Sequence, residues 1–475
     1  MIEFGTGGFR GIIGDDFVKS NIQSIAQALS EVSLENGDPK PIFIGYDNRF
    51  MSDYAAKWFA EVLMGNGIPA ILSASSVPTP LVMMATRDKG LDYGAMMTAS
   101  HNPYIFNGVK VFEKGGVDAG ICFTSMLEKR IAAVKEVVSI PEEEGRKKGL
   151  LQVEDFLPTY ISAIEAFLSP KAFHNPLKVL FNNMNGVGAA SILPIAKDLD
   201  LHEFHAIHTE HDAFFSFTDP NPAKGNIMGG FRDQVLEGHY DFGMATDSDA
   251  DRLGIIDEKG NYVDANEIMA CLYYYLIRYR SMKGDIIKNV ATSSLIDDVA
   301  EALGQKCYAV DVGFKNISAG IKEHDALMGG ESSGGLTVRG YLFGKDSSFS
   351  GALFIEMVAV MGKKVSEIVK EVKEFAGYRH FFHEDSYSFH SSPDAMMDYI
   401  ASHEPSFHLP LLRTSRIQNN YKYEFADGCF VLIRLSGTEP KFRIFAEMQD
   451  EGESLKILSA LEKYLGEADE ACFGN

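Results

Sequence analysis

The sequence is poor in cysteine and has no paired cysteines. Its 475 residues include only five, and no two are spaced as Cys-x-x-Cys. They are Cys122, Cys271, Cys307, Cys429 and Cys472. An odd and scattered set of cysteines excludes a disulfide framework and argues against a thiolate zinc site. We therefore expect the protein to work in a reducing cytoplasm.

The sequence also lacks an excess of positive charge and long hydrophobic runs. The 44 Lys and Arg residues against 66 Asp and Glu give a formal net charge of −22. This balance argues against nucleic acid or an anionic membrane as a partner, and an anionic substrate must meet a local cluster of cations. No apolar run is long enough to span a membrane, and the first residues do not read as a signal peptide. We expect neither a membrane nor a nucleic-acid partner.

Two nucleotide-binding motifs are missing as well. Neither GxxxxGK[ST] nor GxGxxG occurs, which disfavours P-loop nucleotide hydrolysis and dinucleotide chemistry. What the chain does have is 45% hydrophobic and 23% charged residues, as in an ordinary globular protein. Its length exceeds what one hydrophobic core usually serves, so three or four domains are expected.

Short apolar segments alternate with longer segments of helical period over most of the chain. PIFIGYD precedes DYAAKWFAEVLMGNG, and PLKVLFNNMNG precedes AASILPIAKDLD, which predicts α/β layers with parallel sheets. The last hundred residues differ, because CFVLIRLSG and KFRIFAEMQ read as a strand pair followed by a helix. This pattern predicts a small α+β domain at the C-terminal end. The charged stretch 139–149 suggests one boundary, and softer boundaries are expected near 245 and 370.

Three aspartates alternate directly after the expected strand YDFGMAT. Asp247, Asp249 and Asp251 are like charges in close sequence, so they need a cation or a loop that turns them together. Their hard oxygen ligands suit magnesium. A calcium loop competes, since Glu258 is twelfth from Asp247, but the sixth position is Arg252 where such a loop needs glycine. A solvated acidic turn is the other alternative, and we favour the metal site.

Two further loops carry polar side chains among glycines. RLSGTEPKFR (434–443) has the arginines, hydroxyls and glycine that a phosphate clamp requires, with a polar hairpin turn as the alternative. GGESSGG (329–335) matches the G-x-S-x-G elbow of serine hydrolases. The residues after it read as extended rather than helical, which disfavours that elbow. Glu331 and Ser333 are instead candidates for binding polyol hydroxyls.

Histidine and serine residues raise two more questions. His202, His205, His208 and His211 recur every third residue, a spacing that does not converge on a helix or a strand, so a polar surface segment is favoured over a metal site. In TASHNP (98–103), Ser100 is either a nucleophile or a turn residue. Its neighbour His101 does not make a triad, because adjacent side chains in an extended segment point apart.

Five motifs in order carry a resemblance to a known family. FGTGGFRG, TASHNPYIFNGVKVF, DSDADR, GGESSGG and RLSGTEP together resemble the α-D-phosphohexomutase superfamily, and the likeness spans almost the whole chain. The resemblance implies three related α/β domains with mixed sheets and a smaller C-terminal α+β domain around a central cleft. The domains are then 1–145 with the phosphoserine loop, 146–245 ending at the metal loop, 246–370 with the sugar-binding loop, and 371–475 with the phosphate-binding loop.

The resemblance also assigns the site residues. Ser100 would carry a phosphoryl group, and Mg²⁺ would bind to that serine and to Asp247, Asp249 and Asp251. Arg10 and Arg252 would steady the transferring phosphoryl group, while Lys110 and His101 are the candidates for moving a proton. The expected substrate-binding residues are Glu331, Ser333, Lys345, Arg434, Ser436, Gly437, Thr438 and Arg443.

The implied activity is an intramolecular phosphotransfer between hexose 1-phosphate and hexose 6-phosphate, through a phosphoserine enzyme and a bisphosphate intermediate. The expected substrate is the small molecule glucose phosphate, with glucose 1,6-bisphosphate as activator and a monomer or homodimer as the working form. A phosphomannomutase or a broader hexose or pentose phosphomutase is the near alternative. A metal-dependent sugar phosphatase and a non-catalytic sugar-phosphate-binding protein are the more distant ones.

Two departures from the pattern bear on that reading. Members that also take mannose or glucosamine phosphates often have histidine where this chain has Gly335, which leaves the general base open. The chain also has KDSS (345–348) where relatives often have KDG.

Overall fold

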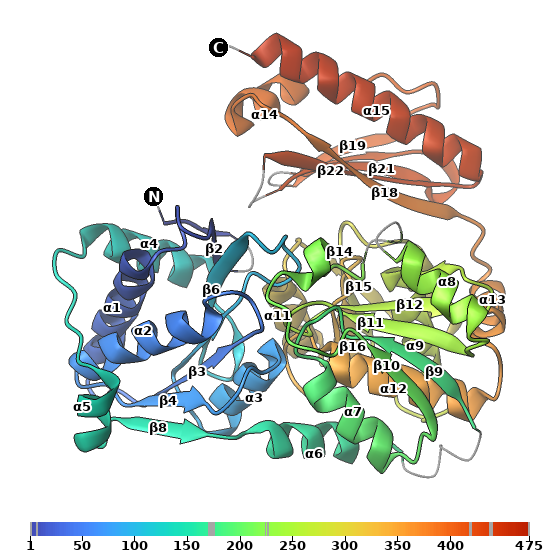
Figure 1. Cartoon of the computed structure of the whole chain (residues 1–475). Helices are drawn as coiled ribbons and strands as arrows, with labels where there is room; N and C mark the ends of the chain where they lie inside the picture. Colours follow the sequence, from blue (N-terminus) through green and yellow to red (C-terminus); the bar gives the residue numbers. More distant parts are fainter. Residues whose placement is uncertain are drawn as a thin grey trace. The chain divides into compact units, whose positions relative to one another are not determined.

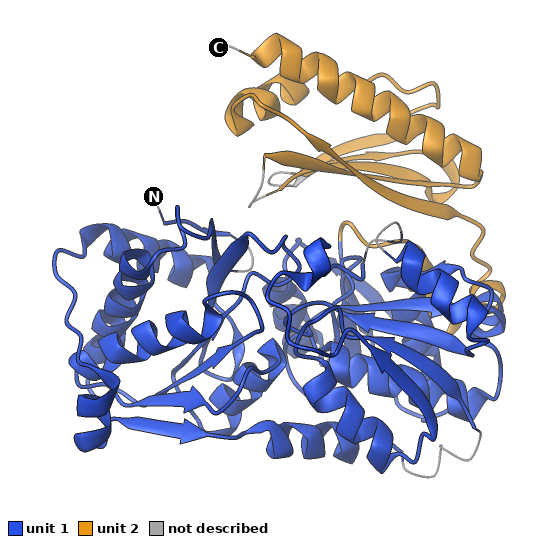
Figure 2. Cartoon of the chain, in the orientation of Figure 1, with its two compact units in different colours: residues 1–289, 305–372 blue, residues 290–304, 373–475 orange. Residues whose placement is uncertain are grey.

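The computed structural model describes residues 2–5, 8–169, 176–223, 225, 228–417, 420–436 and 440–473. The chain divides into two compact units (Figures 1 and 2). The first comprises residues 1–289 and 305–372, and the second residues 290–304 and 373–475. In the described part of the chain, no helix is both long and apolar enough to cross a membrane.

The first sheet of the first unit is eight-stranded, with the order β1-β2-β6-β5-β3-β4-β8 and β7 paired to β6. Strands β5, β3, β4 and β8 run parallel, whereas β6 is antiparallel to β5 and β2, so the sheet is mixed. The strands are β1 (Phe4–Gly5), β2 (Gly8–Ile12), β3 (Ile42–Tyr46), β4 (Ala70–Ser73), β5 (Tyr93–Met97), β6 (Phe106–Glu113), β7 (Val117–Asp118) and β8 (Leu151–Glu154).

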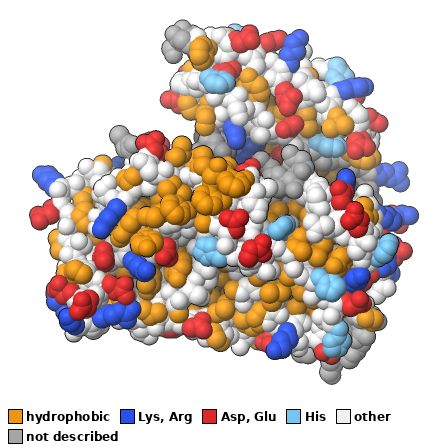
Figure 3. Space-filling model, in the orientation of Figure 1, with side chains coloured by type: hydrophobic (Ala, Val, Ile, Leu, Met, Phe, Trp, Pro, Cys, Tyr) orange, Lys and Arg blue, Asp and Glu red, His pale blue; other side chains and the backbone are white. Residues whose placement is uncertain are grey.

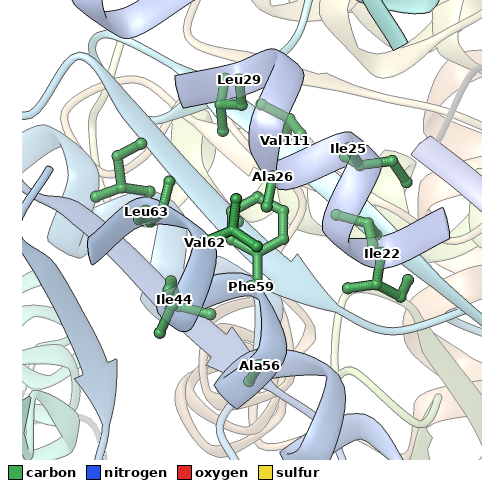
Figure 4. Packing of buried hydrophobic residues seen from close by; sticks show 14 of the residues in the cluster. Ile22, Ile25, Ala26, Leu29, Ile44, Ala56, Phe59, Val62, Leu63 and Val111 are labelled. Atoms are coloured by element: carbon green, nitrogen blue, oxygen red, sulfur yellow. The ribbon is translucent and has the colours of Figure 1, made fainter. Parts of the chain in front are cut away.

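Helices α1 (Lys19–Glu35), α2 (Ser52–Gly65), α3 (Thr79–Asp88), α4 (Ile121–Ala133) and α5 (Glu142–Lys147) accompany this sheet. The core lies between α1, α2 and the strands. Phe59 of α2 is fully buried among Ile25 and Ala26 of α1 and Val111 of β6 (Figure 4). Burying such aromatic and branched side chains typically stabilises the fold by about 1.5–3 kcal/mol each.

The second sheet has the order β10-β9-β11-β12-β13, parallel across its first three strands and antiparallel after that. Its strands are β9 (Lys178–Asn182), β10 (Glu203–Ile207), β11 (Phe242–Thr246), β12 (Leu253–Asp257) and β13 (Tyr262–Val263), and its helices α6 (Leu157–Phe167), α7 (Ala189–Asp198) and α8 (Gly229–Glu237). The four spaced histidines lie around β10 without converging: His205 bonds Tyr240 and His208 bonds Asn182.

The third sheet has the order β15-β14-β16-β17 and is again mixed. Its strands are β14 (Ile286–Asn289), β15 (Cys307–Val310), β16 (Met328–Gly330) and β17 (Leu336–Val338), with helices α9 (Ala265–Arg278), α11 (Phe314–His324), α12 (Ser347–Met361) and α13 (Val365–Ala376). Helix α12 is apolar on all sides and almost entirely buried, as a central core helix should be. The apolar run GALFIEMVAVMG is therefore core.

The second unit contains a five-stranded antiparallel sheet with the order β18-β22-β21-β20-β19. Its elements are β18 (Phe381–Ser388), β19 (Arg413–Ile417), β20 (Asn420–Glu424), β21 (Phe430–Leu435), β22 (Lys441–Met448), α14 (Pro393–Ser402) and α15 (Glu451–Cys472). The expected strand pair and following helix are confirmed as β21, β22 and α15. Three mixed α/β sheets and a smaller α+β part thus confirm the fold class, while the limits of the four domains stay a prediction.

Helix α10 (Leu295–Ala302) belongs with the second unit although it lies between two strands of the third sheet in sequence. The buried carboxylate of Glu447 on β22 explains this grouping. It accepts hydrogen bonds from the hydroxyls of Ser293 and Tyr378, at 2.6 Å each, and from the backbone N–H of Ser294 at 2.9 Å. Nothing in the sequence around 290–304 indicated that link.

The visible surface carries a patch of hydrophobic side chains on the first unit (Figure 3). Acidic and basic side chains are scattered over the rest of that face. No single sign of charge dominates this face, so it offers no broad basic surface to an anion.

A buried carboxylate begins α12 and gives a test of this packing. Asp346 accepts hydrogen bonds from the hydroxyls of Tyr160, at 2.8 Å, and Tyr341, at 2.7 Å, and from the backbone N–H of Phe349 at 2.9 Å. Burial raises the pKa of Asp346 from 3.8 to about 6. The folded state therefore holds this proton more tightly than the unfolded state, and stability falls as the pH rises through about 6.

We expect the stability deficit of Asp346→Asn relative to the native chain to shrink by about 1 kcal/mol between pH 5 and pH 7.5. The reason is that the amide cannot lose the proton whose loss destabilises the native chain. Urea unfolding at the two pH values measures the difference, with Asp38→Asn in an exposed turn as the control. A deficit that grows with pH would contradict this assignment.

Candidate active site

Ser100 follows the end of β5 in a tight left-handed turn. Its φ of 52° is uncommon for a residue with a side chain, and the surrounding contacts hold it there. The Ser100 N–H donates to the Thr98 hydroxyl at 2.8 Å, and its carbonyl accepts from Arg49 and from the Ser248 hydroxyl. The Ser100 hydroxyl is buried and donates to the carboxylate of Asp247 at 3.0 Å. The turn therefore delivers the hydroxyl to the acidic loop.

Arg49 is the main support of this turn, and the sequence reading did not find it. The guanidinium is fully buried and donates to the carbonyls of Ser100, Asn102, Pro103 and Phe106. Its charge is balanced by Asp47 at 3.4 Å, and its flat face stacks 4.8 Å from the centre of the buried Phe215 ring. A planar group with five donors suits this task better than an ammonium. The clue was YDNRF, an arginine directly after an apolar strand.

The loop after β11 gathers the three aspartates. Ligand oxygens of Asp247, Asp249 and Asp251 all lie within 4.8 Å of one another, and all three residues are buried. Among the described residues, one oxygen each of Asp249 and Asp251 is buried without a hydrogen bond. Burial, then Asp251 and Asp249, raise the pKa of Asp247 well above its ordinary value. Buried carboxylate oxygens that lack donors fit a bound divalent cation.

The backbone of this loop rests on a neighbouring loop. A Cβ on Gly186 would lie 2.8 Å from the Asp247 carbonyl oxygen and from Ser248, so only glycine allows this approach. The Val187 N–H donates to the Ser248 carbonyl at 3.0 Å, and the Asn48 side chain donates to the carbonyls of Asn185 and Gly186. The segment 183–187 thus positions the acidic loop, which the sequence reading did not foresee.

Two lysines balance the aspartates from different sheets. Lys110 on β6 donates to Asp249 at 2.7 Å and to Asp251 at 2.9 Å, and Lys345, just before α12, lies 3.2 Å from Asp251. Burial lowers the pKa of Lys110, but the two aspartates raise it more, so the ammonium form is favoured. Burial raises the pKa of Asp251, while Lys110 and Lys345 lower it further, so the net pKa lies below its ordinary value.

Arg10 and Arg252 bring two more cations to this region. Arg10 donates to the Asn102 side chain at 2.6 Å, and the Arg252 Nε lies 3.8 Å from Asp251. Burial, followed by the charge of Arg252, lowers the pKa of Arg10 to about 10. Within the described residues, neither Nε donates a hydrogen bond although both are buried. Two buried guanidinium groups with spare donors form a site for an anion such as a phosphoryl group.

The sugar-binding candidates lie at the end of β16. Glu331 accepts from Asn289 at 2.9 Å and from the Gly313 N–H at 3.0 Å, and the Ser333 hydroxyl lies 3.4 Å from its second oxygen. A Cβ on Gly335 would clash with the stem of Lys345. The lysine therefore lies across the position where a larger residue would project. His101 lies beside Ser100, with Nδ1 3.4 Å from its hydroxyl.

The phosphate-loop candidates belong to the second unit. Arg434 on β21 lies opposite Arg443 on β22, so the two half-buried arginines share one face of the hairpin. Arg443 pairs with Glu384 at 2.9 Å, and the Ser436 N–H donates to the Lys441 carbonyl at 2.8 Å. Gly437 and Thr438 lie outside the described residues. Two like charges directly opposite each other are unfavourable unless an anion lies nearby.

Comparisons with known proteins bear on this arrangement. The domain models of the phosphoglucomutase/phosphomannomutase family match in order: alpha/beta/alpha domain I over residues 1–138, domain II over 158–260 and domain III over 264–375. The chain belongs to the α-D-phosphohexomutase superfamily. Members of this superfamily are phosphohexomutases, a class of isomerases.

Individual relatives extend the likeness over the full length. A phosphoglucomutase/phosphomannomutase of Thermococcus kodakarensis is 29% identical, covering 98% of each chain. A phosphoglucosamine mutase of Nautilia profundicola is 27% identical, covering 97% of this chain and 98% of that one. A solved structure from Thermus thermophilus, named provisionally as a phosphomannomutase, has 26% identity and a TM-score of 0.85 over 98% and 99% of the two chains. The relatives support a hexose phosphate mutase without fixing the sugar.

The support of the Ser100 turn can be tested by replacing its arginine. We expect Arg49→Met to lower the free energy of unfolding by roughly 3–5 kcal/mol, because Asp47 is left as a buried unpaired charge. The free energy of unfolding of Arg49→Lys should lie between those of Arg49→Met and the native chain, because an ammonium group cannot reach all four carbonyls. Urea unfolding measures both, with Arg130→Lys in a partly exposed ion pair as the control. Native-like stability of Arg49→Met would refute the role of this contact.

Proposed function

We propose that this chain interconverts glucose 1-phosphate and glucose 6-phosphate through a phosphorylated Ser100 and a bound glucose 1,6-bisphosphate. The observation that carries the proposal is the Ser100 hydroxyl, held 3.0 Å from Asp247 inside a ring of three buried carboxylates and four cations. Spreading charge over fixed cations is what in-line phosphoryl transfer needs. The reaction is proposed to take place in the cytoplasm, in a monomer or homodimer.

The first half of the reaction breaks the bond between phosphorus and the Ser100 oxygen and forms a bond to a free sugar hydroxyl. The hydroxyl proton leaves toward a basic group nearby, for which His101 is the candidate. Lys110, whose ammonium form is favoured beside Asp249 and Asp251, would instead stabilise negative charge near the reacting groups. Arg10 and Arg252, with their spare donors, hold the phosphoryl oxygens. After the bisphosphate reorients, the other phosphoryl group returns to Ser100, so the sugar leaves as the isomer.

The four groups that would hold Mg²⁺ are Ser100, Asp247, Asp249 and Asp251. The unpartnered oxygens of Asp249 and Asp251 support this assignment. When bound, the ion would neutralise charge on the transferring phosphoryl group. The protein's own residues do the rest: the acidic loop orients the serine, and Lys110 and Lys345 lower the pKa of Asp251.

Sugar and phosphate recognition are assigned to separate groups. Glu331 and Ser333 would bind sugar hydroxyls, and Lys345 would line the same region. Arg434, Ser436, Gly437, Thr438 and Arg443 would hold the phosphate that does not react. A preference for mannose phosphates or a broader range of hexose and pentose phosphates is the second candidate, favoured by the mixed names of the relatives. A sugar phosphatase is a weaker third.

The proposed function is tested by a substrate panel with catalytic glucose 1,6-bisphosphate. We expect conversion of glucose 1-phosphate to glucose 6-phosphate without net release of inorganic phosphate. Ser100→Ala should lose activity by several orders of magnitude, and intact mass should show one phosphate on the native chain that this variant lacks. Thr124→Ala, a buried hydroxyl away from the site, serves as the control. Faster turnover of mannose 1-phosphate would overturn the glucose assignment, and stoichiometric phosphate release would favour the phosphatase.

Removal of the metal gives a second test, with a readout besides activity. Because the three carboxylates repel one another, Mg²⁺ should raise the melting temperature of the native chain. Asp249→Asn removes one of the carboxylate ligands, so the melting temperature of this variant should rise less on addition of Mg²⁺ than that of the native chain. Differential scanning fluorimetry with and without a chelator measures both effects. A melting temperature that ignores Mg²⁺ in the native chain would contradict the metal site.

A further inference from the structure

A carboxylate that none of the motifs contains lies on the face of the first sheet that carries Lys110. Strand β7 pairs antiparallel with β6, and its last residue, Asp118, lies directly opposite Phe112. Opposed residues of neighbouring strands point to the same face, and residues two apart on one strand do too. Asp118 and Lys110 therefore share one face of the sheet.

The packing of β7 brings Asp118 toward the sugar-binding candidates. The turn before it is fixed by Gly116, where a Cβ would clash with the Met83 carbonyl of α3. The same Met83 side chain leaves no room for a Cβ on Gly344, the residue before Lys345. The hairpin that bears Asp118 and the loop that bears Lys345 thus both pack against Met83.

Strand β7 also contacts helix α11. That helix begins directly after Gly313, whose N–H donates to Glu331. The two contacts of β7, with α3 and with α11, place Asp118 between the acidic loop and the sugar-binding loop.

The carboxylate of Asp118 lacks a partner in this position. It is half-buried, and among the described residues it forms no hydrogen bond or ion pair. Burial raises its pKa, while Lys345 and Lys110 act in the opposite direction from a distance. A half-buried carboxylate without a protein partner keeps its acceptor sites free for water or for a hydroxyl of a ligand.

We propose that Asp118 is a sugar-recognition residue whose carboxylate accepts a hydrogen bond from a ring hydroxyl of the bound hexose phosphate. The proposal rests on the proposed function and adds a residue to it. Lys110 and Lys345 already pair with Asp249 and Asp251, so neither cation satisfies the carboxylate of Asp118. The acceptor sites of Asp118 are therefore left for a hydroxyl of the sugar.

The test combines a substitution with altered sugars. Asp118→Ala should raise KM for glucose 1-phosphate on the order of 10- to 100-fold, the worth of one hydrogen bond to a charged group, with little change in kcat. Asp118→Asn keeps the shape of the side chain and a weaker acceptor, so its KM should lie between those of the native chain and Asp118→Ala. A panel of monodeoxy glucose 1-phosphates then identifies the hydroxyl. For the analogue that lacks it, the native chain and Asp118→Ala should have equal kcat/KM.

Controls distinguish this proposal from the proposed function on which it rests. Asp38→Ala removes one negative charge from the exposed turn between α1 and β3, and this variant should leave KM unchanged. If the native chain isomerises no hexose phosphate, the proposed function fails and this proposal fails with it. If the native chain is active, an unchanged KM in Asp118→Ala, or an equal loss for every analogue, overturns the recognition role alone.

Discussion

Three carboxylates lie buried within 4.8 Å of one another, and the arrangement of the first unit follows from balancing them. Buried like charges repel strongly, so each needs a cation or a donor brought from elsewhere. The charged groups come from the regions of separate sheets: Lys110 from the first, the accepting aspartates from the second and Lys345 from the third. Thr79, at the start of α3, adds a hydrogen bond to Asp249 at 2.6 Å. The same contacts that make the site therefore join the three α/β parts.

The serine turn adds a second constraint of the same kind. A left-handed residue with a side chain costs roughly 1–2 kcal/mol and must be held by its surroundings. Arg49 supplies that support by bonding four carbonyls of the turn while its own charge is met by Asp47. The Ser248 hydroxyl ties the turn to the acidic loop through the Ser100 carbonyl. The Ser100 hydroxyl and the carboxylates are thus positioned by one buried network.

Much of this could be read from the sequence, because short motifs encode local chemistry. The strand and helix periods predicted the α/β layers, and the alternating aspartates and the serine turn marked the elements that bear the candidate site. The expectation of parallel sheets from those periods was wrong, because each α/β sheet also contains antiparallel pairs, as the family resemblance implied. Contacts between distant segments left no such signal. In the sequence, Arg49 and Asp118 look like ordinary polar residues. Only the fold places four carbonyls around Arg49 and leaves Asp118 without a partner among the described residues. Glu447 likewise recruits α10 to the second unit through a contact 154 positions apart in sequence.

The absence of a side chain at Gly335 determines where the side chain of Lys345 can lie. A larger residue there would meet the stem of Lys345, and the lysine would have to leave its place beside Asp251. Gly335 and Lys345 therefore depend on each other, because glycine at 335 leaves room for the Lys345 stem to pass the sugar-binding candidates. In a chain with a net charge of −22, Lys110 and Lys345 are each matched by buried aspartates, whereas Arg10 and Arg252 each keep an Nε without an acceptor among the described residues.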